Sequence, residues 1–214
     1  MKTNYQLILD QTLEHLSKET KIPSLLLHVC CAPCSSYVLE YLSNYFYITI
    51  LYYNPNIYPE EEFHKRQQEL KQFLKVQPAK YPIKLIETTF DNKPFHQKIK
   101  NLEHLGERSP RCYQCYLLRM EEAAKYAKEN HFDYFTTVLS ISPYKNSEWI
   151  NEIGYQLEKE YQINYLPADF KKKNGYLRSL ELSKKYNLYR QNYCGCIYSK
   201  LELEQKEKSK NTQV

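Results

Sequence analysis

The sequence predicts an α/β fold in which a largely parallel sheet is covered by helices on both faces. Short apolar runs rich in β-branched and aromatic residues alternate along the chain with amphipathic segments, which is the pattern of βαβ units. The 214 residues contain no internal repeat and no Pro/Gly-rich linker. We therefore expect one domain over residues 1–214.

The amino-terminal third predicts two helices and two strands. An amphipathic helix is expected over residues 5–16, and a buried strand from Leu25 into Cys30, because that apolar run is bounded by proline on both sides. A helix follows, with Ser35 and Ser36 as candidate N-caps and an apolar face formed by Val38, Leu39 and Leu42. Residues 48–53 predict a second strand, which ends at Asn54-Pro55-Asn56.

The rest of the chain continues the alternation. Helical spacing or composition predicts helices over residues 60–76, 111–128, 146–161 and 176–187, and apolar runs predict strands over residues 83–87 and 132–139. Residues 201–214 are highly charged, and we expect those after about residue 205 to fray. In such folds the chemistry lies at the carboxyl ends of the strands.

The distribution of apolar residues argues against a membrane protein. No apolar run approaches the roughly 20 residues that a membrane-spanning helix needs, and the first residues contain no apolar signal core. We therefore expect a cytoplasmic protein with no membrane partner. In a reducing cytosol, an odd number of clustered cysteines favours metal binding or redox chemistry over a disulfide framework.

The seven cysteines fall into three compact groups. One group follows the first expected strand, one begins a helix, and one flanks a glycine: Cys30, Cys31 and Cys34; Cys112 and Cys115; Cys194 and Cys196. Burial as small hydrophobic side chains would not produce this clustering, so we expect the groups to converge on a shared site. Seven thiols are too many for one tetrahedral ion and suffice for a four-iron cluster plus a second metal.

The spacing within each group suggests how its thiols could act. Cys112 and Cys115 would share one face of a helix amino terminus, where the unpaired amides favour thiolates. Cys30 and Cys31 are adjacent in an extended segment, so their side chains should point to opposite sides and serve two neighbouring sites. Gly195 would let the backbone turn so that both flanking thiols face one ion. Zinc, iron–sulfur clusters and dithiol redox pairs all use such motifs.

Basic and aromatic residues are concentrated just before Cys194. The formal net charge is +5, but the basic side chains of this segment are opposed locally by Glu181 alone: Lys171, Lys172, Lys173, Arg178, Lys184, Lys185 and Arg190. Interleaved tyrosines, including Tyr193, would suit RNA phosphates and unstacked bases, although a solvated helix face explains such a run equally well. The turn after Cys31 has no glycine-rich cradle and no P-loop lysine, so ATP chemistry is not expected.

Five motifs along the chain resemble those of one family. They are L-H-V-C-C-A-P-C-S-S-Y from Leu27, Y-Y-N-P-N-I-Y-P from Tyr52, Arg111-Cys112 with Cys115 and Leu118-Arg119-Met120, T-T-V-L-S-I-S-P-Y-K from Thr136, and Y-R-Q-N-Y-C-G-C from Tyr189. In this order they resemble the QueH family of epoxyqueuosine reductases, the cobalamin-independent enzymes of tRNA queuosine modification. The resemblance covers nearly the whole chain.

The resemblance implies a fold related to the adenine-nucleotide α-hydrolase-like (HUP) superfamily, a 4Fe-4S cluster and a nearby mononuclear iron. The metal ligands that it implies are all seven cysteines: Cys30, Cys31, Cys34, Cys112, Cys115, Cys194 and Cys196. As a hypothesis, we assign Cys112 and Cys115 to the cluster and the pair that flanks Gly195 to the second iron. Cys30 and Cys31 would then be divided between the two sites.

The implied reaction is a two-electron deoxygenation of the epoxide of epoxyqueuosine, at the wobble position of tRNA, to the alkene of queuosine. An unidentified donor would supply the electrons. Tyr144, Lys145 and Arg111 are candidate catalytic groups, for substrate contact or proton transfer, because they flank motifs at expected strand or helix ends. The candidate tRNA contacts are Lys171, Lys172, Lys173, Arg178 and Tyr193.

Two other classes of protein would also use clustered cysteines. A zinc-stabilised RNA-binding module without catalysis would account for the basic segment and for up to two tetrahedral sites. A thiol–disulfide oxidoreductase would need one reactive pair and would leave five of the seven cysteines unexplained. Iron and sulfide content distinguishes both from the reductase.

Overall fold

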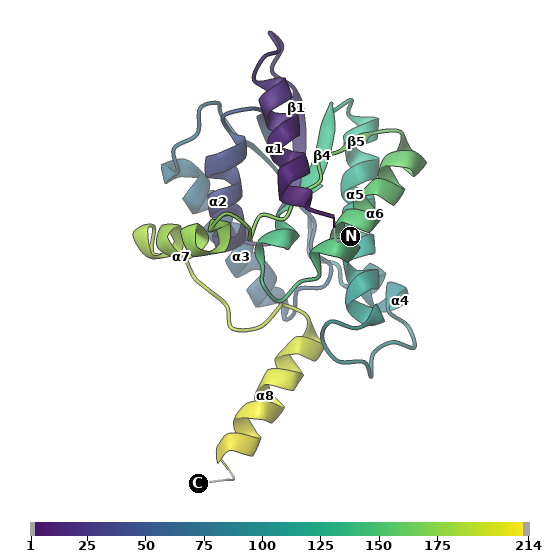
Figure 1. The fold of residues 1–214 in the computed structure, drawn as a ribbon. Helices are drawn as coiled ribbons and strands as arrows, with labels where there is room; N and C mark the ends of the chain where they lie inside the picture. The colour runs from purple at the N-terminus through teal and green to yellow at the C-terminus, as the bar shows by residue number, and fades with distance from the viewer. Residues whose placement is uncertain (1–2, 212–214) are drawn as a thin grey trace.

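Five parallel strands form one sheet in the order β3-β2-β1-β4-β5 in the computed structural model, which describes residues 3–211, the last two by their backbone alone (Figure 1). The strands are β1 (Ser24–His28), β2 (Tyr47–Tyr52), β3 (Lys84–Glu87), β4 (Tyr134–Thr137) and β5 (Asn164–Tyr165). The predicted parallel sheet is confirmed. Because the chain adds strands first on one side of β1 and then on the other, the carboxyl end of β1 lies at the topological switch point, where open sheets bind ligands.

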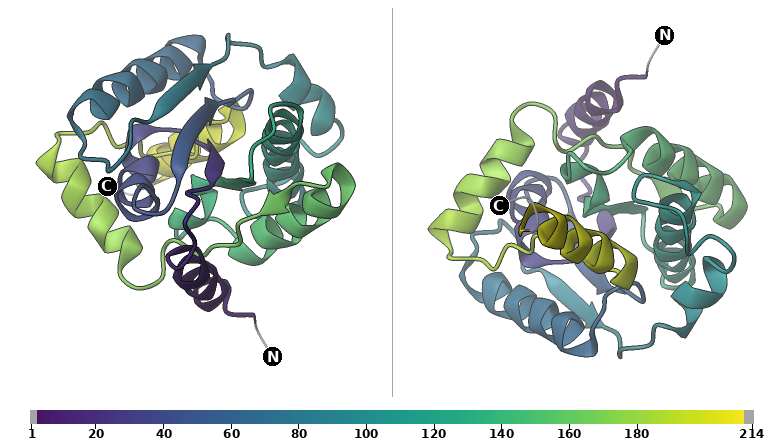
Figure 2. Two further views of the ribbon diagram at one scale, coloured as in Figure 1. Left: turned by 90° about the horizontal axis from the view of Figure 1, so that it is seen from above. Right: turned by 90° about the horizontal axis from the view of Figure 1, so that it is seen from below.

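Helices cover both faces of the sheet, as predicted. On one side lie α2 (Ala32–Leu42), α3 (Glu60–Val76) and α7 (Gly175–Lys185), and on the other lie α5 (Pro110–Glu129) and α6 (Ser147–Tyr161) (Figure 2). α2 packs on α7, and α5 packs on α6. The remaining helices are α1 (Tyr5–Leu16), α4 (Lys93–Lys98) beside α5, and α8 (Ile197–Asn211), which extends away from the body (Figure 1).

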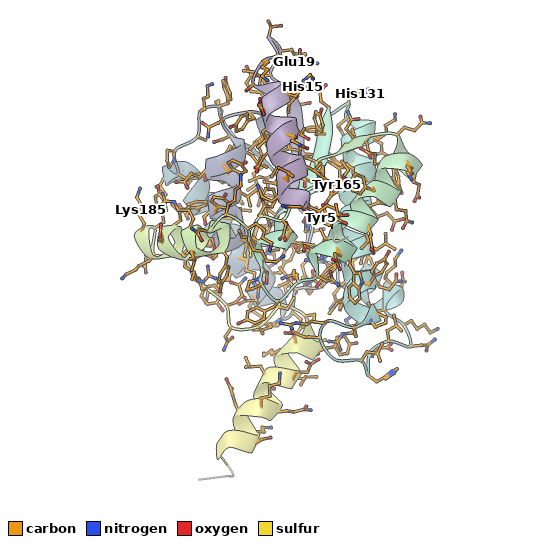
Figure 3. All side chains as sticks on the ribbon, viewed as in Figure 1. Tyr5, His15, Glu19, His131, Tyr165 and Lys185 are labelled. Atoms are coloured by element: carbon orange, nitrogen blue, oxygen red, sulfur yellow. The ribbon has the colours of Figure 1, made fainter. Side chains whose placement is uncertain are left out.

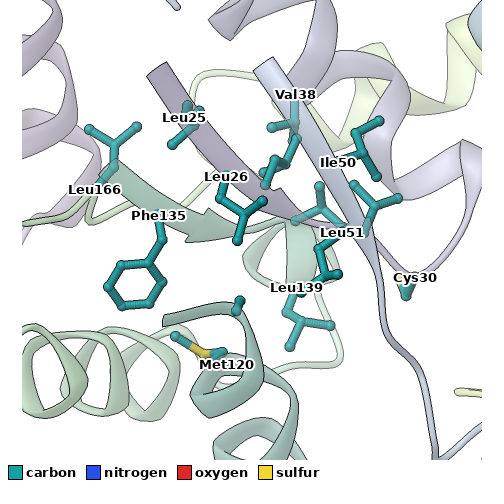
Figure 4. Close-up of a cluster of buried hydrophobic side chains, with 14 of the residues drawn as sticks. Leu25, Leu26, Cys30, Val38, Ile50, Leu51, Met120, Phe135, Leu139 and Leu166 are labelled. Atoms are coloured by element: carbon teal, nitrogen blue, oxygen red, sulfur yellow. The ribbon is translucent and has the colours of Figure 1, made fainter. Parts of the chain in front are cut away.

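The central strands are apolar along their whole length because both of their faces are covered. Leu25, Leu26 and Leu27 of β1 are completely buried. Figure 4 shows Leu26 among side chains from both neighbouring strands and from helices of the two layers, including Val38, Ile50, Leu51, Phe135 and Met120. This core packs around β1 and the residues that follow it.

The start of α2 differs from the prediction. The helix begins at Ala32, and Cys31 rather than Ser35 or Ser36 occupies the N-cap position. Pro33 lies in the first turn, where proline is favoured because its missing N–H needs no partner. The two serine hydroxyls instead donate 3.0 Å hydrogen bonds to the carbonyl oxygens of Ala32 and Pro33. The cysteines are thereby built into the helix start itself.

Other differences concern short or highly charged segments. The strand expected over residues 132–139 ends at Thr137, whose hydroxyl accepts a hydrogen bond from the amide of Leu139 and begins a 3-10 helix over Val138–Ile141. We did not expect α4, β5 or α8. The described backbone of α8 is helical to Asn211, although fraying was expected after about residue 205; residues 212–214 lie outside the described residues.

The long helices and central strands match the predicted positions within a few residues. Among residues 3–211, no helix combines the length and the apolar character that crossing a membrane requires.

Candidate metal centre

Three cysteine sulfurs meet at the carboxyl end of β1. Cys30 follows the strand, Cys31 caps α2, and Cys34 lies one turn into that helix. All three Sγ atoms lie within 4.8 Å of one another, and the Sγ atoms of Cys30 and Cys31 are 3.8 Å apart. The expectation that these two neighbours point to opposite sides is wrong, because the chain bends at Cys30 before the extended residue Cys31 leads into α2.

This spacing suits a single ion. Two thiolates bound at about 2.3 Å to one tetrahedral metal lie about 3.8 Å apart. The hydrogen bonds that Cys31 and Cys34 donate lower the pKa of Cys30 and raise the pKa of both donors, to about 12 for Cys31. The trio thus stabilises one thiolate before any metal arrives, beside a helix amino terminus that favours negative charge.

The other four cysteines form a second group. Cys112 and Cys115 lie in the first turns of α5, and Cys194 and Cys196 flank Gly195, which has φ +120°. Cys115 and Cys196 pack in one buried cluster, and Cys194 interacts electrostatically with each of the other three thiols. Burial raises the pKa of Cys115 to about 11 and that of Cys196 to about 12.

Three cationic side chains interact with the two groups of cysteines, namely Lys145, Arg119 and Arg66. Burial alone would lower the pKa of Lys145, but the thiols of Cys194, Cys30 and Cys34 outweigh burial and raise it, so the side chain stays an ammonium. The guanidinium of Arg119 interacts with Cys115, Cys194 and Cys30.

Two of the buried guanidinium groups have one nitrogen atom without a hydrogen-bond partner among the described residues. Arg119 donates from Nε to the carbonyl oxygen of Cys115, and Arg66 donates from Nε to Glu62 at 2.6 Å. The Nη2 atom of each is buried without a hydrogen-bond partner among the described residues. Thiolate-bound metals carry negative charge, and such donors supply the outer contacts that they need. The donor set and its surroundings therefore fit one metal at the trio, and four further thiols lie beside it.

A cavity of about 260 Å³ opens onto both groups. Five of the seven cysteines line it, namely Cys30, Cys31, Cys34, Cys112 and Cys194. Tyrosines and cations form much of the remaining wall, and one face of α8 contributes Ser199, Glu202, Leu203 and Lys206. The predicted convergence of the three cysteine groups is thus present at one cavity.

A family model described as Epoxyqueuosine reductase QueH matches residues 25–202, which include all seven cysteines. The chain belongs to the QueH family. Several curated relatives carry the same description, Epoxyqueuosine reductase QueH. One from Streptococcus pyogenes serotype M1 is 42% identical over 200 residues, covering 92% of this chain and 78% of the relative. One from Staphylococcus aureus is 39% identical over 205 residues (94% and 85%), and one from Thermotoga maritima is 33% identical over 191 residues (86% and 93%).

Two of the three candidate catalytic residues line the cavity of this QueH protein. Lys145 and the 65% exposed Tyr144 follow the 3-10 helix after β4. Arg111 does not line it: the side chain is buried and donates to the Glu103 carbonyl and to Glu202, both at 3.1 Å. This arrangement links α5 to α8, and a catalytic role of Arg111 stays a prediction.

Several cations of the basic segment form ion pairs with carboxylates in the folded chain. Lys171 pairs with Asp169 at 2.5 Å, Lys173 pairs with Asp10, and Arg178 makes a two-pronged pair with Glu40. Glu181 is the one acidic residue within this segment, but α1 and α2 bring the carboxylates of Asp10 and Glu40 to it. Lys172 is exposed, and Tyr193 lines the cavity and donates from its hydroxyl to the Tyr58 carbonyl.

Among the described residues, no histidine lines the cavity of this QueH protein. His28 is completely buried, with ring nitrogens 2.8 Å from the Thr137 hydroxyl and 3.1 Å from the Tyr53 carbonyl, as expected for a core histidine. Sequence reasoning missed Arg66 as a site residue. It noted Arg119 only as part of a motif. The burial of Arg66 cannot be recognised from the residues around it in the sequence. Arg119 could have been found, because it follows the motif of Cys112 and Cys115.

Proposed function

We propose that this chain reduces epoxyqueuosine in tRNA to queuosine. The relatives named epoxyqueuosine reductase QueH support the activity, and the observation that carries it to this chain is that all three cysteine groups reach one cavity, which five of the seven cysteines line. The reaction takes two electrons and two protons, breaks both carbon–oxygen bonds of the epoxide and releases the oxygen as water. The electrons come from a donor outside this chain, and the place of action is the cytoplasm.

The two sulfur groups would hold different metals. Cys30, Cys31 and Cys34 would hold a mononuclear iron, because three thiols within 4.8 Å fit one ion. Cys112, Cys115, Cys194 and Cys196 would provide the four thiolates of a 4Fe-4S cluster. This division replaces our earlier hypothesis, which placed Cys194 and Cys196 at the single iron and separated Cys30 from Cys31. When bound, the cluster supplies electrons and the single iron supplies a Lewis acid.

The side chains around the cavity would position the substrate. Lys145 faces both sulfur groups as an ammonium, so its Nζ can donate a hydrogen bond to the epoxide oxygen as negative charge develops there. The Tyr144 hydroxyl lies on the exposed rim and can deliver a proton from the solvent side. The cavity walls contributed by α8 would limit the access of water to the reacting carbon atoms.

Metal analysis and turnover test the proposal together. Anaerobically purified protein should contain about five irons and four sulfides per chain, and with a chemical reductant it should convert epoxyqueuosine in tRNA to a product lighter by one oxygen. Cys34→Ser should lose about one iron and keep the sulfide, whereas Cys196→Ser should lose the sulfide. Zinc without sulfide, and no turnover, would instead support the non-catalytic RNA-binding module.

A further inference from the structure

Two arginine–tyrosine pairs line the cavity alongside the cysteines. The guanidinium carbon of Arg108 lies 5.8 Å from the ring centre of Tyr144, and that of Arg190 lies 5.9 Å from the ring centre of Tyr176. The pairs come from separate parts of the chain. Arg108 is in the loop between α4 and α5, and Arg190 is in the segment between α7 and α8. Figure 1 shows these two segments on opposite sides of the start of α8.

Both guanidinium groups are exposed and have no carboxylate partner among the described residues. The side chain of Arg190 donates one hydrogen bond, from Nη1 to the Ser183 hydroxyl at 3.0 Å, and that of Arg108 contacts the Tyr144 ring. They differ in this from Arg178, which binds two carboxylates.

Among the described residues, neither of the two carboxylates that line the cavity forms an ion pair with Arg108 or Arg190. Glu202 pairs with Arg111, and Glu107 accepts a 2.5 Å hydrogen bond from Ser199. Positive charge at Arg108 and Arg190 is therefore available to a ligand. Each of these arginines also stands beside a tyrosine ring with an exposed or half-buried face.

We propose that the Arg108–Tyr144 and Arg190–Tyr176 pairs bind the nucleotides on either side of the modified base, with each guanidinium on a phosphate and each ring against a base. This inference rests on the proposed function and names the surface through which the RNA is held. Single-stranded loops are recognised through phosphate contacts and through stacking of unpaired bases on aromatic rings. A base must also leave its stack to reach a cavity of this kind, and contacts on both flanks would hold it there.

The proposal is tested by binding of a fluorescent tRNA anticodon stem–loop to the anaerobically purified enzyme, measured by anisotropy across a salt titration. Arg108→Gln and Arg190→Gln should each weaken binding about fivefold at about 0.1 M salt and reduce the slope of log affinity against log salt by about 0.7. Tyr176→Leu should weaken binding between about fivefold and a hundredfold, and Tyr176→Phe should restore it.

Lys18→Gln is the matched control, because it also removes one positive charge. Lys18 pairs with Glu14 near the end of α1. The labels of His15 and Glu19 in Figure 3 mark that end, far from α8. The Lys18→Gln substitution should leave the affinity for the stem–loop and the salt slope unchanged.

Three outcomes separate the proposals. If affinity and salt slope are unchanged in both arginine variants, the proposed RNA-binding surface is refuted. It is also refuted if Lys18→Gln loses as much affinity for the stem–loop as the arginine variants do. RNA binding that depends on Arg108 and Arg190, in an enzyme that does not reduce the base, would uphold the surface and refute the proposed activity.

Discussion

Replacing Gly195 with alanine should damage the four-cysteine group while leaving the trio intact. Gly195 has φ +120°, and holding an alanine there costs about 1–3 kcal/mol. Its Cβ would also lie 2.9 Å from Nη1 of Arg66, a side chain that is held by Glu62. We therefore expect the free energy of unfolding of the metal-free protein to fall by about 2 kcal/mol, which lowers Tm by about 4–8 °C.

Calorimetry on metal-free protein measures the loss of stability, and iron and sulfide analysis after reconstitution measures the site. The displaced backbone between Cys194 and Cys196 should prevent retention of the sulfide, whereas one iron should remain with Cys30, Cys31 and Cys34. Gly106→Ala is the control, because a Cβ at Gly106 meets nothing within 4 Å and should change stability by less than about 0.5 kcal/mol. A Gly195→Ala protein with the Tm and the sulfide content of the wild type would refute this reasoning.

Three further predictions concern single side chains. Tyr144→Phe should keep RNA affinity within about twofold, since the ring remains; a fall in kcat of about tenfold or more would show that the hydroxyl transfers a proton. Lys173→Gln should change RNA affinity by less than about twofold because Asp10 already neutralises the charge, and a loss equal to that in Arg190→Gln would contradict this. Burial raises the pKa of Asp133, but hydrogen bonds from Ser24 and the Lys21 ion pair outweigh it and lower the pKa. Denaturation measured across pH should therefore show that Asp133→Asn is less stable than the wild type by about 1–2 kcal/mol at neutral pH. The difference should disappear as the pH falls below about 3.9, where the carboxylate becomes protonated. A difference that stays constant with pH would exclude the carboxylate as its cause.

The helices and strands that could be predicted are those with a local signal of sufficient length. α1 and α3 have the predicted bounds because a repeated apolar face is visible in the sequence of each helix alone. β5 is two residues long and exists through its pairing with β4, and the Thr136 hydroxyl donates to the carbonyl of Leu166 just beyond it. α8 carries charge on most of its surface, so its role as a cavity wall appears only when the rest of the cavity is in place.

The candidate site divides in the same way between what spacing determines and what only folding brings together. Cysteine groups at element ends could be expected to meet, because parallel strands end at one edge of the sheet. The net charge of a surface could not be predicted from the sequence, because it depends on ion pairs between residues that are far apart in the chain. Arg178 is 138 residues from Glu40, and Lys173 is 163 residues from Asp10, yet these pairs neutralise two of the seven cations in the segment that looked most basic. Arg108 lies outside that segment and Arg190 near its end, and both keep their charge because no carboxylate reaches them among the described residues. A run of basic residues therefore predicts a basic surface only where the fold brings no acidic partners to it, whereas Arg108 and Arg190 line the cavity without a carboxylate partner among the described residues.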